Sequence, residues 1–494
     1  MRKTLFFNII IFAASVLFAG CNLTSEEYSQ ISSDLYPVTE RDAYDILTGA
    51  AYSPFSADGW GNAFSSSNGF FALADIATDF GYCSWAEETW GPLEFAMFDG
   101  TERTGDASAY NPRTKWGSIN QLSKMELAIS RIKGIIMDEN LQARYIAELE
   151  CAQGFMAFML WDFYGGLVIA DLETLKNPQE GIILPRKSSD ETVNYIKNKL
   201  NSAKNVLPTT IQYGSADYGR FTRGLCHTLL LKLYMQTKDW TNAEIEGREL
   251  MKPEYGYALV RDKGDMESAY ANIFSDANEG NSETVWAVNL AVDHAMNYWY
   301  FTVVDWGGFK ISPSFYQTFE AGDQRKGGAV IEDQGSGKYL PLKYEVYKCP
   351  GGDCVTDWII YRYADVITLL AEAIVKKSNS VTGEAIDLLN QVRTRAGLTA
   401  YTAADLPDVN TFVEKLLWER AHELWYEGCR RQDLIRNNVY AATMAKKCED
   451  YGKSKAHLDI LGEANSHLFP LPSSAINEFR KGGFANQQNP GYGD

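Results

Sequence analysis

Two segments of the chain, residues 54–113 and 276–314, combine aromatic side chains with glycines and polar residues. Such a mixture suits carbohydrate binding, because the flat faces of Trp and Tyr pack on the C–H groups of sugar rings. Polar side chains at the rim can then pair with the sugar hydroxyls. The predicted ligand contacts are Tyr82, Trp85, Trp90, Asn297, Tyr298, Trp299 and Trp306.

The alternative for each single residue is packing between helices, since large aromatic side chains dominate protein cores as well. Clustering in two long, Gly-rich segments favours binding for the two groups as a whole. Loops of such length, when they are ordered, are usually functional.

Catalytic motifs are incomplete in this sequence. His422 and Glu423 begin like a zinc-protease helix, but Tyr426 stands where the second histidine ligand would be. Lys338 is followed by Tyr339, and Glu332 replaces the first glycine of a phosphate-binding loop. A glycoside hydrolase needs two carboxylates about 5–10 Å apart, and the 64 acidic residues single out no such pair. We therefore predict no catalytic residue, no metal ligand and no cofactor.

The N-terminus has the features of an export signal. Arg2 and Lys3 precede an apolar stretch at 5–18, which is too short for a typical membrane-spanning helix. The small residues Ala19 and Gly20 before Cys21 resemble a bacterial lipobox, in which Cys21 is lipidated. The alternative is an ordinary signal peptide with a chance cysteine. We expect a signal peptide at 1–20, a tether at 21–36 and a folded body at 37–494.

The charge balance excludes some partners. The 494 residues include 46 basic and 64 acidic side chains, for a formal net charge of −18. Nucleic-acid binding needs a basic stripe, and electrostatic docking on anionic lipid needs basic clusters. Acyl chains on Cys21 would supply membrane affinity without such clusters.

Seven cysteines remain when Cys21 is set aside, an odd number that forbids a fully paired framework. Cys349 and Cys354 flank a Pro-Gly-Gly turn and form the one local disulfide candidate. The sequence allows either a disulfide or two free thiols at this place. A zinc site is disfavoured because no second Cys pair or His lies nearby.

The spacing of apolar residues predicts a mainly helical body. The predicted helices span 42–52, 120–136, 141–163, 190–206, 221–236, 358–377, 383–395 and 412–426, with another ending at 251. Residues 284–288 are typical of a strand. Successive helices form hairpins of about 34 residues, which favours tetratricopeptide-like packing.

A longer succession of motifs carries a family resemblance. It includes Arg362 and Asp365, the run Arg393-Thr394-Arg395-Ala396-Gly397-Leu398, and the run Leu468-Phe469-Pro470-Leu471-Pro472. Further matching stretches lie at 39–52, 219–240, 358–373, 419–424, 427–436 and 488–492. Their order resembles the SusD/RagB family of Bacteroidetes nutrient-binding lipoproteins. Arg431-Gln432 departs from the family, which usually has aromatic residues at this place.

The resemblance implies a fold and a role. The fold would be a single mainly α globule on a tetratricopeptide-like scaffold, with long loops and minor β structure. Its N-terminal half would span about 37–275 and its C-terminal half about 276–494. The role would be that of a non-enzymatic, surface-exposed lipoprotein of the outer membrane, which passes oligosaccharide to a SusC-like TonB-dependent transporter. A peptide or glycopeptide cargo, and less favourably a surface glycoside hydrolase, are the alternatives.

The charged motif residues have a structural interpretation. We expect them to form buried, charge-paired networks between helices rather than a ligand site. The residues are Arg362, Asp365, Glu427, Arg430, Asp433 and Arg436.

Overall fold

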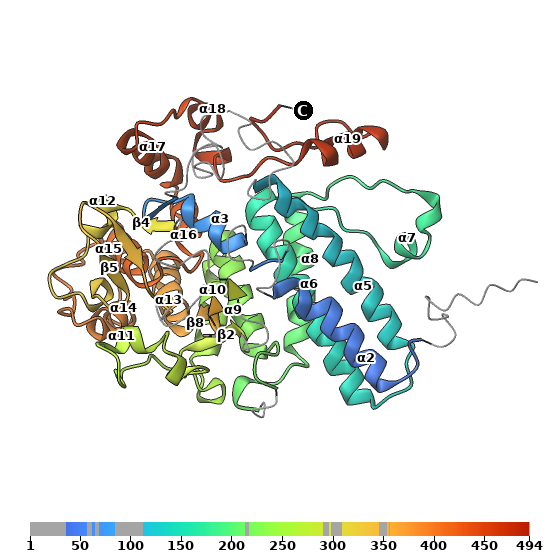
Figure 1. Cartoon of the computed structure of the whole chain (residues 1–494), viewed down its shortest axis with the longest axis horizontal. Helices are drawn as coiled ribbons and strands as arrows, with labels where there is room; N and C mark the ends of the chain where they lie inside the picture. Colours follow the sequence, from blue (N-terminus) through green and yellow to red (C-terminus); the bar gives the residue numbers. More distant parts are fainter. Residues whose placement is uncertain are drawn as a thin grey trace, which may run out of the picture.

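The computed structural model describes residues 36–56, 62–64, 69–83, 112–212, 217–289, 296–297, 309–344, 353–354 and 356–493. Over these ranges the fold is mainly helical with small antiparallel sheets (Figure 1). This confirms the predicted class of a mainly α body with minor β structure. Among the helices described, none is both long and apolar enough to cross a bilayer.

Three N-terminal helices pack side by side at the right of Figure 1. They are α2 (Glu40–Leu47), α5 (Asn120–Lys133) and α6 (Glu139–Tyr164). Thr39 caps α2 through a capping box with Asp42. Helix α2 continues through a π-helical turn, η1 (Thr48–Tyr52), and η2 (Ser53–Phe55), so the predicted helix at 42–52 is confirmed.

Helix α6 is the central element of this half. It is apolar almost all round and buries nearly every side chain from Ala147 to Leu160. Such a helix must be covered on all sides, and α2, α5 and α8 (Ser189–Lys204) provide that cover.

Helical hairpins continue the packing across the molecule. Helix α8 packs on α9 (Arg223–Gln236), which forms a hairpin with α10 (Trp240–Leu250). Helix α10 packs on α13 (Tyr363–Ser378), which pairs with α14 (Gly383–Arg395). This stacking confirms the predicted tetratricopeptide-like scaffold.

One predicted helix begins with a strand instead. Residues 358–362, within the helix predicted at 358–377, form β8 (Trp358–Arg362), antiparallel to β2 (Thr284–Val288). The run Trp-Ile-Ile-Tyr is rich in β-branched and aromatic residues, which favour a pleated strand. All ten residues of the two strands are buried, so neither shows the alternation that marks a one-sided strand.

The first aromatic segment also contains a helix that its composition did not predict. Helix α3 (Phe70–Ile76) leads into strand β1 (Gly81–Cys83). Strand β1 is an edge strand of a four-stranded sheet with the order β1-β4-β6-β5. The other strands are β4 (Phe309–Ile311), β6 (Tyr339–Pro341) and β5 (Ile331–Asp333). A further pair joins β3 (Met296–Asn297) to β7 (Asp353–Cys354).

The C-terminal helices complete the body. They are α15 (Val409–Glu423), α16 (Arg430–Arg436), α17 (Tyr440–Asp450), α18 (Ala456–Asn465) and α19 (Ser473–Lys481), and the last three run along the top of Figure 1. Helix α15 ends before the predicted residue 426, because Tyr426 and Gly428 both adopt positive φ. Shorter elements are α7 (Leu172–Lys176), α11 (Ala269–Asn272), α12 (Pro313–Tyr316), η3 (Pro112–Ile119), η4 (Pro178–Glu180), η5 (Thr210–Gln212), η7 (Pro253–Tyr255), η8 (Asp276–Asn278) and η10 (Gln324–Lys326).

Candidate ligand-binding site

Two of the seven predicted contact residues lie in described strands. Tyr82 is half-buried in β1, and the backbone of Asn297 pairs with Asp353 between β3 and β7. The remaining five, Trp85, Trp90, Tyr298, Trp299 and Trp306, lie outside the described residues. So do Cys21 and Cys349, while Cys354 is described only through its backbone pairing with Met296.

The strand pairing brings the two predicted aromatic segments to one place. Strand β1 ends at Cys83, and Cys83 is the direct partner of Phe309, where β4 begins. The first segment therefore leaves the sheet beside the point at which the second enters it. Ser312 extends this junction, because its N–H donates to Phe80 O at 2.7 Å and its hydroxyl to Asp79 O at 3.0 Å.

A cleft of about 470 Å³ opens next to this junction, between α12, α15, α16 and α17. Its size falls in the range of small-ligand sites. It is lined by Asp79, Ser314, Phe315, Thr318, Trp418, Arg430, Ala442, Thr443, Lys446, Lys447, Asp450 and Tyr451.

Aromatic side chains form one part of the cleft. Trp418 on α15 and Tyr451 after α17 are both half-buried. The ring of Tyr82 lies 5.6 Å from that of Tyr451, so the predicted contact residue joins the edge of the cleft. Burial raises the pKa of Tyr82 above its ordinary value, and its hydroxyl therefore stays neutral and able to donate.

Four of the five charged side chains that line the cleft form two ion pairs. Arg430 donates to both carboxylate oxygens of Asp79, at 2.9 and 2.7 Å, and lies 5.1 Å above the Trp418 ring. Burial alone would raise the pKa of Asp79, but the charge and hydrogen bonds of Arg430 lower it below its ordinary value. Lys446 pairs with Asp450 at the rim. This internal pairing suits a neutral, hydroxyl-rich ligand better than a strongly charged one.

Lys447 has a positioning role beneath the cleft. It is buried, and its Nζ donates to Ile76 O and Gly81 O, each at 2.7 Å. These bonds tie α17 to the end of α3 and the start of β1. The cleft walls and the junction of the two aromatic segments are thus held in fixed relation.

His422, which begins the incomplete zinc motif, is a core residue. Its ring stacks on Phe319 at 4.3 Å and its Nε2 lies 2.8 Å from the Thr318 hydroxyl. Burial lowers the pKa of His422 well below its ordinary value, so the ring is neutral. Nor do any three His, Cys, Asp or Glu side chains in the described ranges lie close enough together to hold a metal ion.

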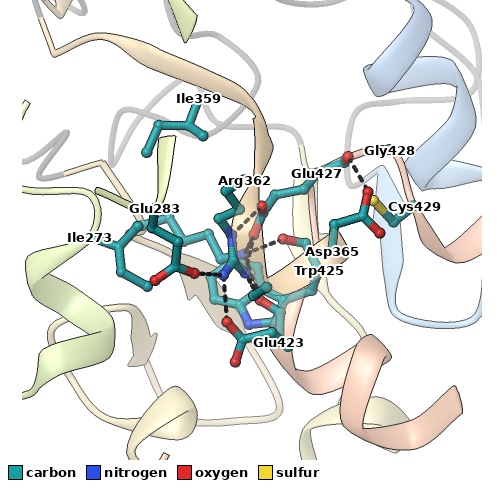
Figure 2. Close-up of polar contacts among 12 residues, drawn as sticks. Ile273, Glu283, Ile359, Arg362, Asp365, Glu423, Trp425, Glu427, Gly428 and Cys429 are labelled. Atoms are coloured by element: carbon teal, nitrogen blue, oxygen red, sulfur yellow. Dashed lines mark hydrogen bonds and ion pairs between the residues drawn. The ribbon is translucent and has the colours of Figure 1, made fainter. Parts of the chain in front are cut away.

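A buried network surrounds Arg362, the N-cap residue of α13 (Figure 2). Its Nη1 lies 2.6 Å from Glu283 and 2.5 Å from Glu423, and its Nε lies 2.6 Å from Glu427. Burial would raise the pKa of Glu423, but Arg395 and Arg362 lower it to about 2. The network joins β8 and β2 to the end of α15.

A second buried network centres on Arg420. It donates to Asp365 at 2.7 Å and to Asp433 at 2.8 Å, and Arg436 bridges Asp433 to Glu372. With the Arg430–Asp79 pair, these contacts confirm the expected buried pairing of all six charged motif residues. Sequence reasoning did not assign Glu372 and Arg395 to the network, although both lie within the matching stretches, and it missed Glu283, which lies outside them.

Arg431 explains the departure noted in the motif. Its guanidinium lies over the rings of Phe163 and Phe469, at 4.9 and 5.2 Å, and its Nη1 lies 2.6 Å from Asp162. It thus occupies an aromatic environment and connects α16 to the end of α6 and to the C-terminal segment.

The stacked helical hairpins form a tetratricopeptide-like scaffold, and an open, partly aromatic cleft lies among α12, α15, α16 and α17. Residues 338–492 match the model of the SusD family, so this part of the chain is similar to SusD family proteins. SusD family proteins are non-catalytic binding proteins, which agrees with the incomplete catalytic motifs.

Curated relatives match shorter stretches of the chain. SusD-like protein P38 of Formosa agariphila is 38% identical over 95 residues, or 18% of either protein. Starch-binding protein SusD of Bacteroides thetaiotaomicron is 32% identical over 138 residues, which are 28% of this chain and 22% of SusD. The matched stretches thus span about a fifth of each curated relative.

The likeness in fold extends over much more of the chain. Surface glycan-binding protein A from Bacteroides thetaiotaomicron, solved in complex with laminarihexaose, superposes with a TM-score of 0.72 at 19% identity. The superposition covers 92% of this chain and all of that one.

Proposed function

We propose that this chain is a surface glycan-binding lipoprotein of the outer membrane, which captures an oligosaccharide and delivers it to a SusC-like TonB-dependent transporter. The observation that carries the proposal is the open aromatic cleft at the junction of the two aromatic segments, in a fold shared with a laminarihexaose-binding protein.

In this proposal the predicted contact residues act together with the cleft. Trp85 follows Cys83 by two residues and Trp306 precedes Phe309 by three. Chain geometry therefore keeps their Cα atoms within about 7 Å and 11 Å of these paired strand residues. Trp90, Asn297, Tyr298 and Trp299 would extend the same aromatic surface, with Trp418, Tyr82 and Tyr451 at its base.

The cargo in this proposal is a neutral glycan. The internally paired charges of the cleft leave hydroxyl-directed hydrogen bonds and ring stacking as the main attractions. The names of two relatives refer to starch and laminarihexaose, both neutral glucans, and such glucans are the first probes to test.

The membrane attachment follows from the N-terminal motif. In the proposal, residues 1–20 are removed, Cys21 carries the lipid, residues 21–36 form a tether and residues 37–494 form the body. The acyl chains would hold the acidic protein at the membrane without help from surface charge.

Calorimetry on the soluble chain from residue 22 onward tests the binding step. Titration with maltohexaose, laminarihexaose and a wider panel of oligosaccharides is expected to give saturable binding to at least one glycan. The variants Trp85→Ala/Trp90→Ala and Trp299→Ala/Trp306→Ala should weaken that binding at least tenfold. Trp240→Ala, on α10 and outside the lining of the cleft, is the matched control and should bind as the wild type does.

Two outcomes would contradict the proposal. One is binding to peptides or glycopeptides with no binding to any glycan, which would reassign the cargo. The other is sustained hydrolysis of an oligosaccharide, seen by product chromatography. Delivery is tested separately, by co-purification of the full-length lipoprotein with a SusC-like transporter from native membranes.

A further inference from the structure

Two cysteines far apart in the sequence meet in the core. Cys151 lies on α6 and Cys226 in the first turn of α9, 75 residues further on. The Cys226 thiol lies 3.5 Å from the Cys151 sulfur, and neither side chain is exposed to solvent. The sulfurs are thus already in contact, although no covalent bond joins them.

We propose that Cys151 and Cys226 form a disulfide in the exported protein, and that this bond links α6 covalently to α9. The inference rests on the proposed export, because thiols are oxidised outside the cytoplasm and kept reduced within it. A disulfide has a sulfur–sulfur distance of about 2.05 Å. The two sulfur atoms therefore need to approach by about 1.5 Å for the bond to form.

The bond forms by thiol–disulfide exchange with an oxidised dithiol, such as a thiol oxidase of the cell envelope. One cysteine thiolate attacks the partner disulfide and forms a mixed disulfide, and the second thiolate then displaces the partner. The two cysteines lose two protons and two electrons in total, and the partner disulfide is reduced to two thiols.

Burial determines when this exchange can occur. Burial and the hydrogen bond from Cys226 raise the pKa of Cys151 well above its ordinary value, so little reactive thiolate exists in the folded state. No oxidant can reach a pair that is completely buried. The bond must form while the chain folds, and the folded protein then keeps the redox state in which it folded.

The wild-type chain provides the direct test. The chain from residue 22 onward is unfolded, reduced and refolded with a mixture of reduced and oxidised glutathione, then alkylated, digested and analysed by mass spectrometry without reduction. The peptides that contain Cys151 and Cys226 should be cross-linked in most molecules. Refolded protein in which both thiols are alkylated would overturn the proposal, whatever the location of the protein in the cell.

The same chain exported through residues 1–20 should carry the same cross-link, and protein that folded under reducing conditions should not acquire it after folding.

Thermal unfolding adds a second readout. Wild type refolded with the glutathione mixture should have a Tm about 5 °C above that of wild type refolded under a reductant, whereas the Cys151→Ala/Cys226→Ala variant should have the same Tm after either refolding. An equal Tm of the two wild-type preparations would contradict the bond.

This test is independent of glycan binding. If the protein binds glycan but shows no cross-link, only the disulfide is rejected. If the protein is cross-linked but binds no glycan, the disulfide stands and the proposed function is rejected.

Discussion

At the scale of single residues, the molecule separates side chains that hold the fold from side chains that can meet a ligand. Arg362, Arg420 and Glu423 are buried. Arg362 pairs with Glu423, and Arg420 pairs with Asp365 on α13. Trp418 and Tyr451 are half-exposed in the cleft. Both groups lie in the C-terminal part of the chain, so only burial and contacts distinguish them.

Trp418 offers a direct test of the cleft. Trp418→Ala removes an aromatic wall, and loss of one stacking contact of about 1–1.5 kcal/mol corresponds to about tenfold weaker glycan binding. Calorimetry with the best glycan of the panel measures this change. The control Trp240→Ala should retain wild-type affinity, and an unchanged affinity in Trp418→Ala would exclude the cleft from the binding surface.

Glu423 tests the buried network. Glu423→Gln removes a charge that lies between Arg362 and Arg395, and an uncompensated buried charge costs about 3–5 kcal/mol. Urea unfolding measures the loss. Glu384→Gln is the matched control, because Glu384 pairs with Arg248 at the surface with 47% of its side chain exposed, and such pairs contribute at most about 1 kcal/mol. Equal effects of the two variants would contradict the role of the network.

The same carboxylate predicts a pH dependence. The pKa of Glu423 is lowered from its ordinary value to about 2 in the folded protein. Its contribution is therefore complete above its unfolded pKa, near 4.3, and is lost as the pH falls from about 5 towards 2. Urea unfolding at pH 7, 5 and 3 should show decreasing stability, with a shallower decrease in Glu423→Gln. A parallel decrease in both proteins would assign the acid sensitivity to other carboxylates.

At the scale of elements, the turn between α15 and α16 sets the position of both buried networks. Gly428 has a φ of +70°, and a Cβ there would lie 2.5 Å from the ring of Phe71 on α3. Its N–H donates to the Asp75 carboxylate. The turn therefore requires glycine for its backbone conformation and for the close approach of α3.

Gly428→Ala is expected to destabilise the protein by more than about 2 kcal/mol, because both the backbone conformation and the contact with Phe71 become unfavourable. Chemical denaturation of the folded chain measures the effect. Gly383→Ala is the control, since Gly383 begins α14 with open space around it, and it should be neutral or slightly stabilising. A tolerated Gly428→Ala would show that the turn can relax.

At the scale of the whole molecule, the two proposed halves share one core. Trp286 on β2 lies 5.7 Å from Phe155 on α6 and 5.4 Å from Phe221. Helix α10 packs on α13, and Asp75 bonds to Gly428. Neither half therefore encloses its own apolar side chains.

The isolated fragment 37–275 is expected not to fold cooperatively, since it lacks Trp286 and α13, whereas the chain from residue 37 onward should unfold in one transition. Circular dichroism and calorimetry of the two proteins measure this difference. A sharp, independent transition of the fragment would establish two separate domains instead of one body.

Prediction from the sequence succeeded where the determinants are local. Helices α5, α6, α8, α9 and α14 follow from apolar spacing and caps, and β2 follows from its run of β-forming residues. It failed for residues 358–362, because a strand buried on both faces has the same continuous apolar pattern as a buried helix.

For the candidate site, the sequence pointed to Tyr82 and to the two aromatic segments, but not to Trp418 or Tyr451. These two residues lie on different elements, and only the packing of α15 and α17 against α16 places them in one cleft. Likewise the sequence suggested pairing of nearby cysteines, while Cys151 and Cys226 meet only through the contact of α6 and α9.

The sequence by itself predicted the helical hairpins, the resemblance to the SusD/RagB family and the charged motif, because each depends on residue types at short, fixed spacing. The tertiary structure alone decided which charges neutralise one another, that Cys83 and Phe309 unite the two aromatic segments, and which thiols touch. These are contacts between residues far apart in the chain. They depend on how helices and strands pack, which no local spacing encodes.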